Sequence, residues 1–195
     1  MKRLFDFTIS LIFSILFTPL WIIVGGWIKL TSSGPIFFRQ VRVGKDAKEF
    51  KIIKYRTMVV DAEKKGLQIT VGGRDPRITK VGYYLRKSKL DELPQLFNII
   101  LGEMSFVGPR PEVPKYVAMY TEKQREVLRV RPGITDLASI EYIDENELLK
   151  DAQDPEQMYT EQIMQEKLKL NLEYLKRRSL SSDIGIIFKT LIKII

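Results

Sequence analysis

Two adjacent carboxylates, Asp91 and Glu92, lie at the centre of the most informative stretch of this chain. They stand just before Pro94, and proline is favoured in the first turn of a helix. Arg86 precedes them by about one helical turn, and Arg110 follows in a proline-rich segment. Exposed N–H groups and the helix dipole favour ionised carboxylates at a helix N-terminus. Carboxylates among guanidinium groups indicate phosphate chemistry, although an acidic first turn is also common in ordinary helices.

Other basic residues could hold phosphate beside this pair. Three prolines surround Arg110 between Gly102 and Pro114, and a rigidly presented guanidinium suits bidentate phosphate binding. A surface loop with an ion pair between Arg110 and Glu112 is the alternative. A second set lies in a predicted strand and could form a row facing phosphate, although a solvated basic strand explains the pattern equally well: Lys51, Lys54 and Arg56.

The composition limits the chemistry that is possible. The 195 residues include no His and no Cys, which excludes an imidazole base, a thiolate nucleophile and Cys-ligated zinc. The net charge of +8 favours an anionic partner, such as lipid headgroups, a phosphorylated substrate or nucleic acid. In one economical scheme Mg²⁺ bridges an acidic side chain and a diphosphate, arginines hold the phosphoryl oxygens, and a carboxylate attacks phosphorus.

An apolar run from Leu4 to Ile28 with one charge, Asp6, precedes these polar residues. As a straight helix it would be roughly 37 Å long, enough to cross a hydrocarbon core of about 30 Å. Pro19 removes a helix hydrogen bond, and Thr18 is placed to satisfy the freed backbone groups. Basic residues flank both ends, which favours the cytoplasm for both: Lys2, Arg3, Lys29, Arg39 and Arg42. These residues leave a spanning helix and a re-entrant helix equally possible.

The rest of the chain must form elements that position the carboxylates. Two apolar-basic runs, Ile36 to Val43 and Glu49 to Tyr55, predict a β-hairpin. Thr79 is a suitable N-cap for a helix that ends at Lys87. Further helices are predicted for Asp91 to Leu101, Val113 to Val130, and Pro155 to Arg178.

The C-terminal segment has apolar residues on one face from Asp183 onward: Ile184, Ile187, Phe188, Leu191, Ile192 and Ile195. With basic residues nearby, this pattern is typical of an interfacial helix on anionic lipid. A helix docked on the domain core explains the pattern as well.

Ordered motifs run through most of the chain after the apolar segment with Pro19. They read Phe50-Lys51-Ile52-Ile53-Lys54-Tyr55-Arg56-Thr57-Met58, Asp75-Pro76-Arg77-Ile78-Thr79, Leu85-Arg86, Leu90-Asp91-Glu92-Leu93-Pro94-Gln95, Gly102-Glu103-Met104-Ser105-Phe106-Val107-Gly108-Pro109-Arg110-Pro111 and Pro132-Gly133-Ile134-Thr135. In these motifs and their spacing the chain resembles the small monotopic phosphoglycosyl transferases, bacterial enzymes that start lipid-linked glycan assembly.

The resemblance implies an α+β fold with two parts. Residues 1–30 would form a re-entrant membrane helix hinged at Thr18 and Pro19. Residues 31–195 would form a mainly helical cytoplasmic catalytic domain, with a small β-hairpin or sheet and a C-terminal interfacial amphipathic helix. The expected location is the cytoplasmic face of the bacterial inner membrane, against anionic headgroups.

The resemblance also implies a reaction. Asp91 would attack the sugar-linked phosphate of a nucleoside diphosphate sugar, a UDP-sugar in the common case, and release UMP from a phosphosugar–aspartyl intermediate. Polyprenol phosphate, usually undecaprenyl phosphate, would then take the phosphosugar. Glu92 would accept a proton, and Mg²⁺ would sit near Asp91. The residues expected to bind substrate phosphate or order the site are Arg86, Arg110, Lys54, Arg56 and Arg131.

One stretch departs from the family pattern. After Pro132-Gly133-Ile134-Thr135 the chain reads Asp136-Leu137-Ala138-Ser139-Ile140, where a glycine and later a glutamine are usual. This difference bears on nucleotide or sugar specificity and not on phosphoryl transfer.

Two other classes of function compete with the transferase. A membrane-bound phosphatase would use the same aspartate but resolve the intermediate with water. A basic membrane scaffold would need no aspartate at all. No nucleic-acid-binding motif is present in the sequence, so a nucleic-acid partner is not expected.

Overall fold

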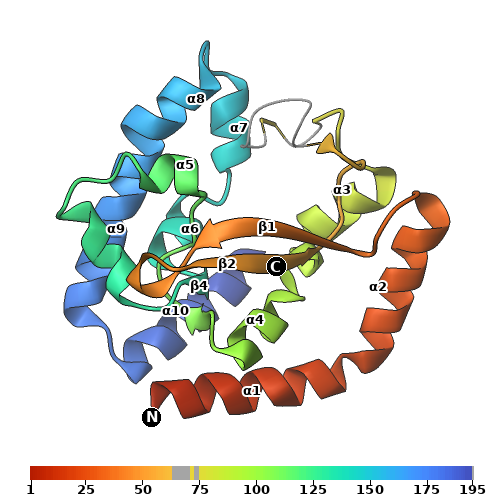
Figure 1. Cartoon of the computed structure of the whole chain (residues 1–195), viewed down its shortest axis with the longest axis horizontal. Helices are drawn as coiled ribbons and strands as arrows, with labels where there is room; N and C mark the ends of the chain where they lie inside the picture. The colour runs from red at the N-terminus through yellow and green to blue at the C-terminus, as the bar shows by residue number, and fades with distance from the viewer. Residues whose placement is uncertain (63–70, 73–74, 195) are drawn as a thin grey trace.

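Figure 1 presents the computed structural model of the chain, which describes residues 1–62, 71–72 and 75–194. The described part is mainly helical with two small sheets, as the sequence predicted for an α+β fold. The longer helices are α1 (Lys2–Leu16), α2 (Thr18–Thr31), α3 (Lys80–Lys87), α4 (Gln95–Leu101), α9 (Met164–Arg177) and α10 (Leu180–Ile194). The short ones are α5 (Pro114–Val117), α6 (Leu137–Glu141), α7 (Glu145–Lys150) and α8 (Pro155–Met158). The strands are β1 (Phe37–Val43), β2 (Glu49–Tyr55), β3 (Ser105–Val107) and β4 (Gly133–Thr135).

The N-terminal apolar run forms two helices that meet at a sharp bend. Within the described residues no single helix is long and apolar enough to cross a bilayer; α1 and α2 qualify only as a pair, and they are bent by 63°. Pro19 lies in the first turn of α2 and has no N–H to donate to the carbonyl of Ile15. The Thr18 hydroxyl donates to that carbonyl instead, at 2.7 Å. The sequence therefore located the break and its side-chain cap correctly.

The predicted hairpin is confirmed: β1 and β2 pair antiparallel over seven residues each. Helix α4 lies along β2 and is attached to it by the fully buried Asn98. The Asn98 side-chain oxygen accepts from the Ile53 N–H, and its amide nitrogen donates to the Lys51 carbonyl, both at 2.9 Å. This contact fixes the start of α4, and with it the turn that carries Asp91 and Glu92, relative to β2.

Helix boundaries agree with the sequence in some places and differ in others. Thr79 caps α3, with its hydroxyl accepting from the Gly82 N–H at 3.0 Å. The predicted helix from Asp91 is shorter, because Leu90–Glu92 forms a 3₁₀ turn and α4 begins only after Pro94. The prediction of one helix from Val113 to Val130 was wrong. That segment forms α5 and a separate 3₁₀ helix, Gln124–Arg129.

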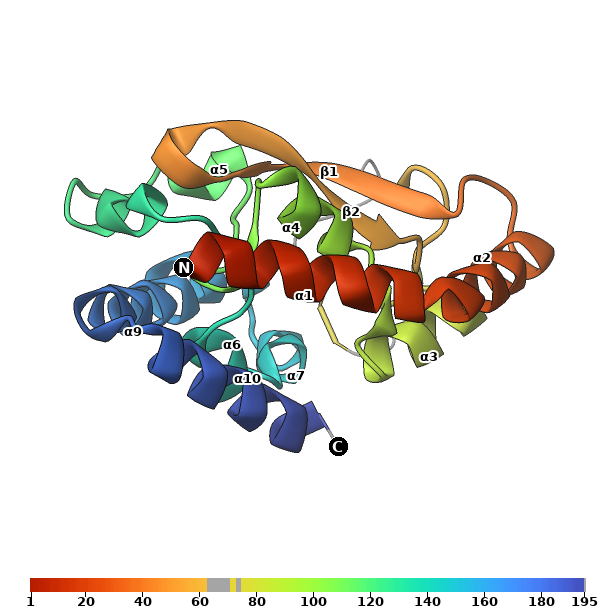
Figure 2. The ribbon, with the colours of Figure 1, turned by 90° about the horizontal axis from the view of Figure 1, so that it is seen from below.

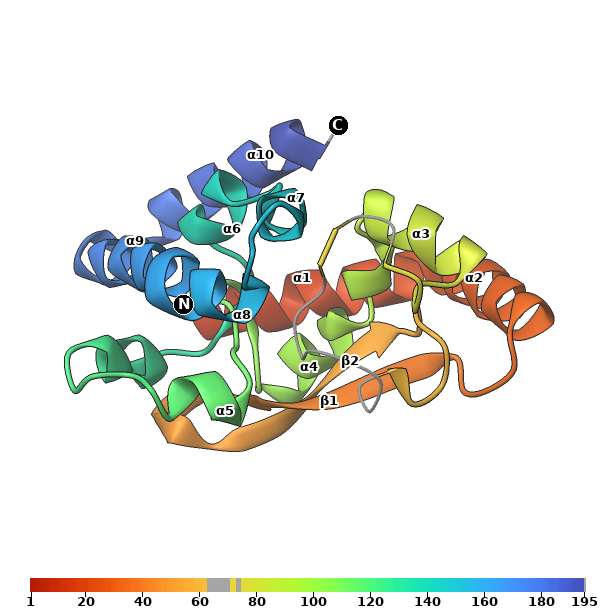
Figure 3. The same ribbon diagram turned by 90° about the horizontal axis from the view of Figure 1, so that it is seen from above.

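The elements pack around several small cores. Val24 and Ile28 of α2 pack with Tyr55 and with Val81 and Leu85 of α3. Figure 3, seen from above, shows the long hairpin with α5 beside β1, and α8, α9 and α10 on the other side of the molecule. A two-stranded parallel sheet of β3 and β4, which the sequence did not predict, joins the two sides.

One face of the molecule carries many exposed apolar side chains. Figure 2, seen from below, shows α1, α2 and α10 uncovered by other elements. Ile186 of α10 is buried, whereas much of the apolar face predicted for this helix is exposed. The C-terminal helix is therefore docked on the core along one side and open to the surroundings along another. The exposed apolar residues on the three helices are Leu4, Phe7, Leu11, Ile12, Phe13, Ile15, Leu16, Ile22, Ile23, Trp27, Leu30, Leu180, Ile184, Phe188, Leu191 and Ile192.

Candidate active site

Asp91 and Glu92 lie in the 3₁₀ turn Leu90–Glu92 between α3 and α4. Lys89, the residue before this turn, has a left-handed backbone with φ 56°. Such a conformation is uncommon and costly for a residue with a Cβ atom, and strained residues often occur at functional sites. The sharp reversal at Lys89 turns the chain from α3 into the turn, and both carboxylates face cations from other elements.

Glu92 is held by two cations from distant parts of the chain. Its Oε1 accepts from the Lys54 ammonium of β2 at 2.7 Å. Both terminal guanidinium nitrogens of Arg110 also donate to the Glu92 carboxylate, one of them to Oε2 at 3.3 Å. Although burial opposes it, the charges of Arg110 and Lys54 hold the pKa of the Glu92 carboxyl well below its usual range. Glu92 is therefore an ionised partner for two buried cations.

Asp91 has a different environment from its neighbour. Its side chain is buried, with 8% of the residue exposed, yet it accepts no hydrogen bond from any residue that the structure describes. Burial, and then the charge of Glu92, raise the pKa of the Asp91 carboxyl above its ordinary value. The positive charges of Lys54, Arg86 and Lys89 oppose this rise. Asp91 is thus a poorly satisfied carboxylate among cations, a condition that favours bonding to an electrophile or a metal ion.

Arg86 approaches the pair from the last turn of α3. Its Nε donates to the Thr57 hydroxyl at 2.9 Å, and burial lowers the pKa of its guanidinium. Beside it, Arg77 forms a bidentate ion pair with the buried Asp75, with the shortest N–O distance 2.6 Å. The charge of Arg86 also acts on both Asp75 and Asp91. The motif from Asp75 to Thr79 therefore lies at the edge of this site.

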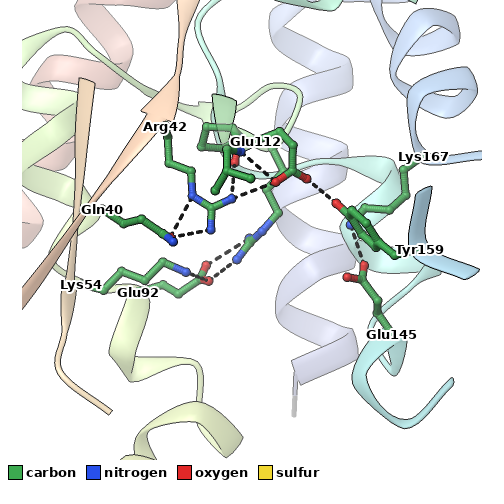
Figure 4. A network of polar contacts seen from close by, with 11 residues as sticks. Gln40, Arg42, Lys54, Glu92, Glu112, Glu145, Tyr159 and Lys167 are labelled. Carbon is green, nitrogen blue, oxygen red and sulfur yellow. Dashed lines mark hydrogen bonds and ion pairs between the residues drawn. The ribbon is translucent and has the colours of Figure 1, made fainter. Parts of the chain in front are cut away.

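The loop that carries Arg110 is fixed from both sides, as Figure 4 shows for part of the network. Glu112 accepts from Arg42 of β1 at 3.1 Å and from the hydroxyl of Tyr159. The backbone of Glu112 also bridges to Val43. The ion pair between Arg110 and Glu112 that the sequence allowed does not form, since each pairs with another residue. The loop thus presents the Arg110 guanidinium to Glu92 with little freedom.

Asp136, the departure from the family pattern, supports the same loop. It is fully buried; its Oδ1 caps α6 by accepting from the Ser139 N–H at 2.5 Å. Its Oδ2 accepts from the backbone N–H of Arg110 at 3.0 Å. Sequence reasoning missed this role, although an aspartate three residues before a serine N–H donor is a recognisable N-cap signal.

The structure does not bring all the predicted phosphate-binding residues together. Lys54, Arg86 and Arg110 surround the carboxylates. Arg56 instead donates to the carbonyls of Pro35 at 2.6 Å and Ser32 at 3.0 Å, and so holds the chain after α2. Arg131 donates to the Gly102 carbonyl at 2.7 Å, at the C-terminal end of α4.

The row of Lys51, Lys54 and Arg56 also does not form as one surface. Lys51 and Lys54 are three residues apart, and side chains of a strand alternate between its two faces. Lys51 is exposed, Lys54 is directed to Glu92, and Arg56 lies beyond the end of β2. Only Lys54 of this row reaches the candidate site.

Mg²⁺ fits this site through one protein ligand. Among the described residues no three acidic side chains form a metal cluster. Mg²⁺ usually keeps several waters and binds through one or two carboxylates together with substrate phosphates. Asp91, buried and without a hydrogen-bond donor, is the carboxylate available for such an arrangement.

Comparison with known proteins identifies similar sequences along the entire chain. The family model described as bacterial sugar transferase matches residues 1–195. A UDP-glucose:undecaprenyl-phosphate glucose-1-phosphate transferase of Klebsiella pneumoniae is 39% identical over 197 residues, covering 98% of this chain and 39% of that protein. A UDP-N-acetylgalactosamine-undecaprenyl-phosphate N-acetylgalactosaminephosphotransferase of Aeromonas hydrophila is 37% identical, covering 97% of this chain and 42% of that protein.

A shorter relative matches over most of its own length. The exopolysaccharide production protein ExoY of Rhizobium meliloti is 34% identical over 204 residues, covering 97% of this chain and 83% of that protein. The chain spans about two fifths of the length of the Klebsiella and Aeromonas relatives. The region shared by all three includes the whole candidate site.

Proposed function

Because the chain belongs to the bacterial sugar transferase family, we propose that it transfers a sugar phosphate from a nucleoside diphosphate sugar to a polyprenol phosphate. Undecaprenyl phosphate is the acceptor in the names of the Klebsiella and Aeromonas relatives, and UDP-sugars are the donors. The observation that carries the proposal is the contrast between two adjacent carboxylates. Glu92 binds Lys54 and Arg110, whereas Asp91 lies near cations but makes no hydrogen bond or ion pair with any described residue.

Asp91 is the proposed nucleophile. One of its oxygens attacks the sugar-linked phosphorus, the bond to the nucleotide phosphate breaks, and UMP leaves with the electron pair of that bond. Burial and the charge of Glu92 disfavour free ionised Asp91. Forming the acyl phosphate removes the charge from the Asp91 carboxylate, and the leaving UMP carries it away. The polyprenol phosphate oxygen then attacks the same phosphorus and returns Asp91 to its carboxylate form.

The basic side chains hold the diphosphate during this exchange. Arg110 and Lys54 are held in place by Glu92, so they present charge to phosphoryl oxygens without further ordering. Arg86 adds a third cation from α3. Asp91 would hold Mg²⁺, and the ion would supply further neutralisation of the phosphate charge.

Glu92 has a positioning role in this proposal. A general base works best when its pKa lies near the working pH. The low pKa of Glu92 makes it a weak proton acceptor while Lys54 and Arg110 are bound. We therefore assign Glu92 to holding these two cations, in place of the proton-accepting role that the family resemblance implied.

The proposed place of action is the cytoplasmic face of a bacterial membrane, with α1 and α2 re-entering it. The bend of 63° and the exposed apolar side chains of α1, α2 and α10 support this arrangement. The chain has no Cys, so a single Cys introduced at position 2 can be labelled specifically. Labelling from the cytoplasm, together with a Cys at position 33, supports re-entry; labelling of position 2 from the opposite side contradicts it.

The activity is tested by nucleotide release from the detergent-purified protein with Mg²⁺ and a panel of UDP-sugars, with and without undecaprenyl phosphate. Lipid-dependent UMP production from one donor supports the transferase and identifies its sugar. UMP that accumulates equally without the lipid indicates a hydrolase. Release of UDP contradicts attack at phosphorus, because it means that the sugar moved without its phosphate.

A further inference from the structure

A polar cavity lies apart from the candidate active site. It has a volume of about 440 Å³, within the range of about 300–1,000 Å³ that is usual for small-ligand sites. Its walls come from the first turn of α1, the hairpin turn, the segment before β4 and the junction of α9 and α10. None of its lining residues contributes a side chain to the network around Glu92. Its charged lining residues are Lys2, Arg3, Asp6, Lys45, Arg129, Arg131, Arg178 and Asp183.

The two carboxylates of this cavity are already satisfied. Asp6 accepts from the Ser105 hydroxyl at 2.8 Å in a buried position. Asp183 accepts from the Tyr174 hydroxyl at 2.6 Å and pairs with the Lys2 ammonium. These acids therefore hold the walls together, and they leave most of the positive charge of the cavity uncompensated.

Four arginines of the cavity have no carboxylate partner in the described part of the chain. Arg3 donates to the carbonyls of Ile99 at 2.5 Å and Ile100 at 2.9 Å, and Arg131 donates to a carbonyl as well. Neutral carbonyls orient these guanidiniums without removing their charge. The side chains of Arg129 and Arg178 are exposed at the cavity and make no hydrogen bond or ion pair with any residue that the structure describes. The excess positive charge thus comes from two guanidiniums that carbonyl groups orient, Arg3 and Arg131, and from two that are exposed, Arg129 and Arg178.

We propose that this cavity binds the phosphate headgroup of an anionic membrane lipid. Planar guanidiniums suit the oxygens of a phosphate group. The half-exposed Leu180 lines the cavity, and Leu4, 71% exposed, follows Arg3 directly on α1. The lining of the cavity therefore continues into the exposed apolar residues of α1 and α10, along which acyl chains can lie. Figure 2 shows these two helices uncovered by other elements. The inference rests on the proposed membrane placement.

The test uses detergent-purified full-length protein, freed of lipid and titrated in native mass spectrometry. The probes are short-chain phosphatidylglycerol, the matching phosphatidylcholine, and inorganic phosphate. The test variant is Arg129→Gln with Arg178→Gln, which removes the two guanidiniums that make no hydrogen bond or ion pair in the described part of the chain. The matched control is Arg125→Gln with Arg177→Gln. Arg125 lies in the same 3₁₀ helix as Arg129, and Arg177 is the last residue of α9, directly before Arg178. Both control residues are exposed and lie outside the cavity, so the net charge changes equally.

The expected result is one saturable phosphatidylglycerol molecule on the wild-type protein, bound more tightly than phosphatidylcholine. The cavity variant should bind it about 25-fold more weakly, because each of the two basic groups near a lipid phosphate contributes about fivefold. The control variant should retain the wild-type affinity. Equal losses in both variants overturn the proposal in favour of general charge attraction. If inorganic phosphate binds as tightly as phosphatidylglycerol, the proposal that the cavity recognises a lipid is contradicted.

This experiment does not depend on the proposed reaction. It contains no nucleotide sugar, and Asp91→Asn should bind phosphatidylglycerol as the wild type does. Lipid binding without UMP release would support the proposed lipid site and contradict the proposed reaction. UMP release without saturable lipid binding would support the reaction and contradict the lipid site.

Discussion

The candidate active site around Asp91 and the cavity at the start of α1 differ in the sign of their unpaired charge. In the first, the cations Lys54 and Arg110 are bound by Glu92, and the free group is a carboxylate. In the second, the acids are bound, and the free groups are the guanidiniums of Arg129 and Arg178. In each region, charges of one sign are paired, and a charge of the other sign has no hydrogen-bond or ion-pair partner among the described residues. That unpaired charge indicates which ligand each region can accept: an electrophile or metal ion in one, an anion in the other.

The strongest test of this comparison removes the unpaired carboxylate. Asp91→Asn should lower the rate of UMP release by on the order of 10³-fold or more, because no acyl phosphate can form at an amide side chain. UMP release with donor and undecaprenyl phosphate measures this. Asp46→Asn, an exposed change at a hairpin position where asparagine suits the left-handed backbone, is the matched control. Wild-type release by Asp91→Asn would remove this residue as the nucleophile.

Removing the paired carboxylate should mainly affect stability. Glu92→Gln leaves Lys54 and Arg110 without a counter-charge, and the expected loss in the free energy of unfolding is about 3 kcal/mol. Denaturant unfolding measures it, with Glu49→Gln as an exposed control. The folded pKa of Glu92 is depressed, so its stabilisation is complete above the unfolded pKa of about 4.3 and is lost as the pH falls toward the folded value. The difference between Glu92→Gln and wild type should shrink over that pH range.

A stability difference that did not change below pH 4 would contradict the ionised state of Glu92. In the same experiment, Asp91→Asn should change the free energy of unfolding in the opposite direction. Because the fold raises the pKa of Asp91, its ionised form opposes folding at neutral pH, and the variant should gain stability.

Asp183→Asn should have a smaller and mixed effect on the cavity. The change weakens a buried hydrogen bond from Tyr174 and the ion pair with Lys2, and should cost about 2 kcal/mol in thermal unfolding. It also frees the Lys2 ammonium, so phosphatidylglycerol should bind about fivefold more tightly at temperatures where the variant is folded. Asp151→Asn, an exposed change, is the control for both measurements. A loss of lipid binding by the folded variant would mean that Asp183 shapes the cavity instead of competing with its ligand.

Features set by local sequence were predictable. The hairpin follows from alternating residues around a turn, the Thr79 cap from a single side chain, and the bend from Pro19 with Thr18. The two carboxylates were identified by their own spacing to nearby prolines and arginines. In each case the deciding interaction joins residues within a few positions or repeats at a fixed period.

Features set by distant contacts were not predictable from pattern. Glu92 differs from Asp91 because Lys54 reaches it from 38 residues away and Arg110 from 18. Glu112 pairs with Arg42 and Tyr159, partners 70 and 47 residues away, so the rigidity of the Arg110 loop was predicted for the wrong reason. The segment from Val113 to Val130 has helical composition, yet it divides into α5 and a 3₁₀ helix as it packs against β1 and α9.

The smallest expected effect concerns the hinge that separates the two regions. Helix α1 brings its first turn to the cavity, whereas α2 packs through Val24 and Ile28 on α3, directly before the candidate active site. Thr18→Val removes the hydroxyl that satisfies the Ile15 carbonyl, and should cost about 0.5–1 kcal/mol in thermal unfolding. Thr8→Val, an exposed change of the same kind on α1, should cost less, because no side-chain hydrogen bond from Thr8 is found among the described residues. Equal costs for the two variants would show that the Thr18 hydroxyl does not hold the bend, and that Pro19 and the packing of α2 are sufficient to keep the two regions in place.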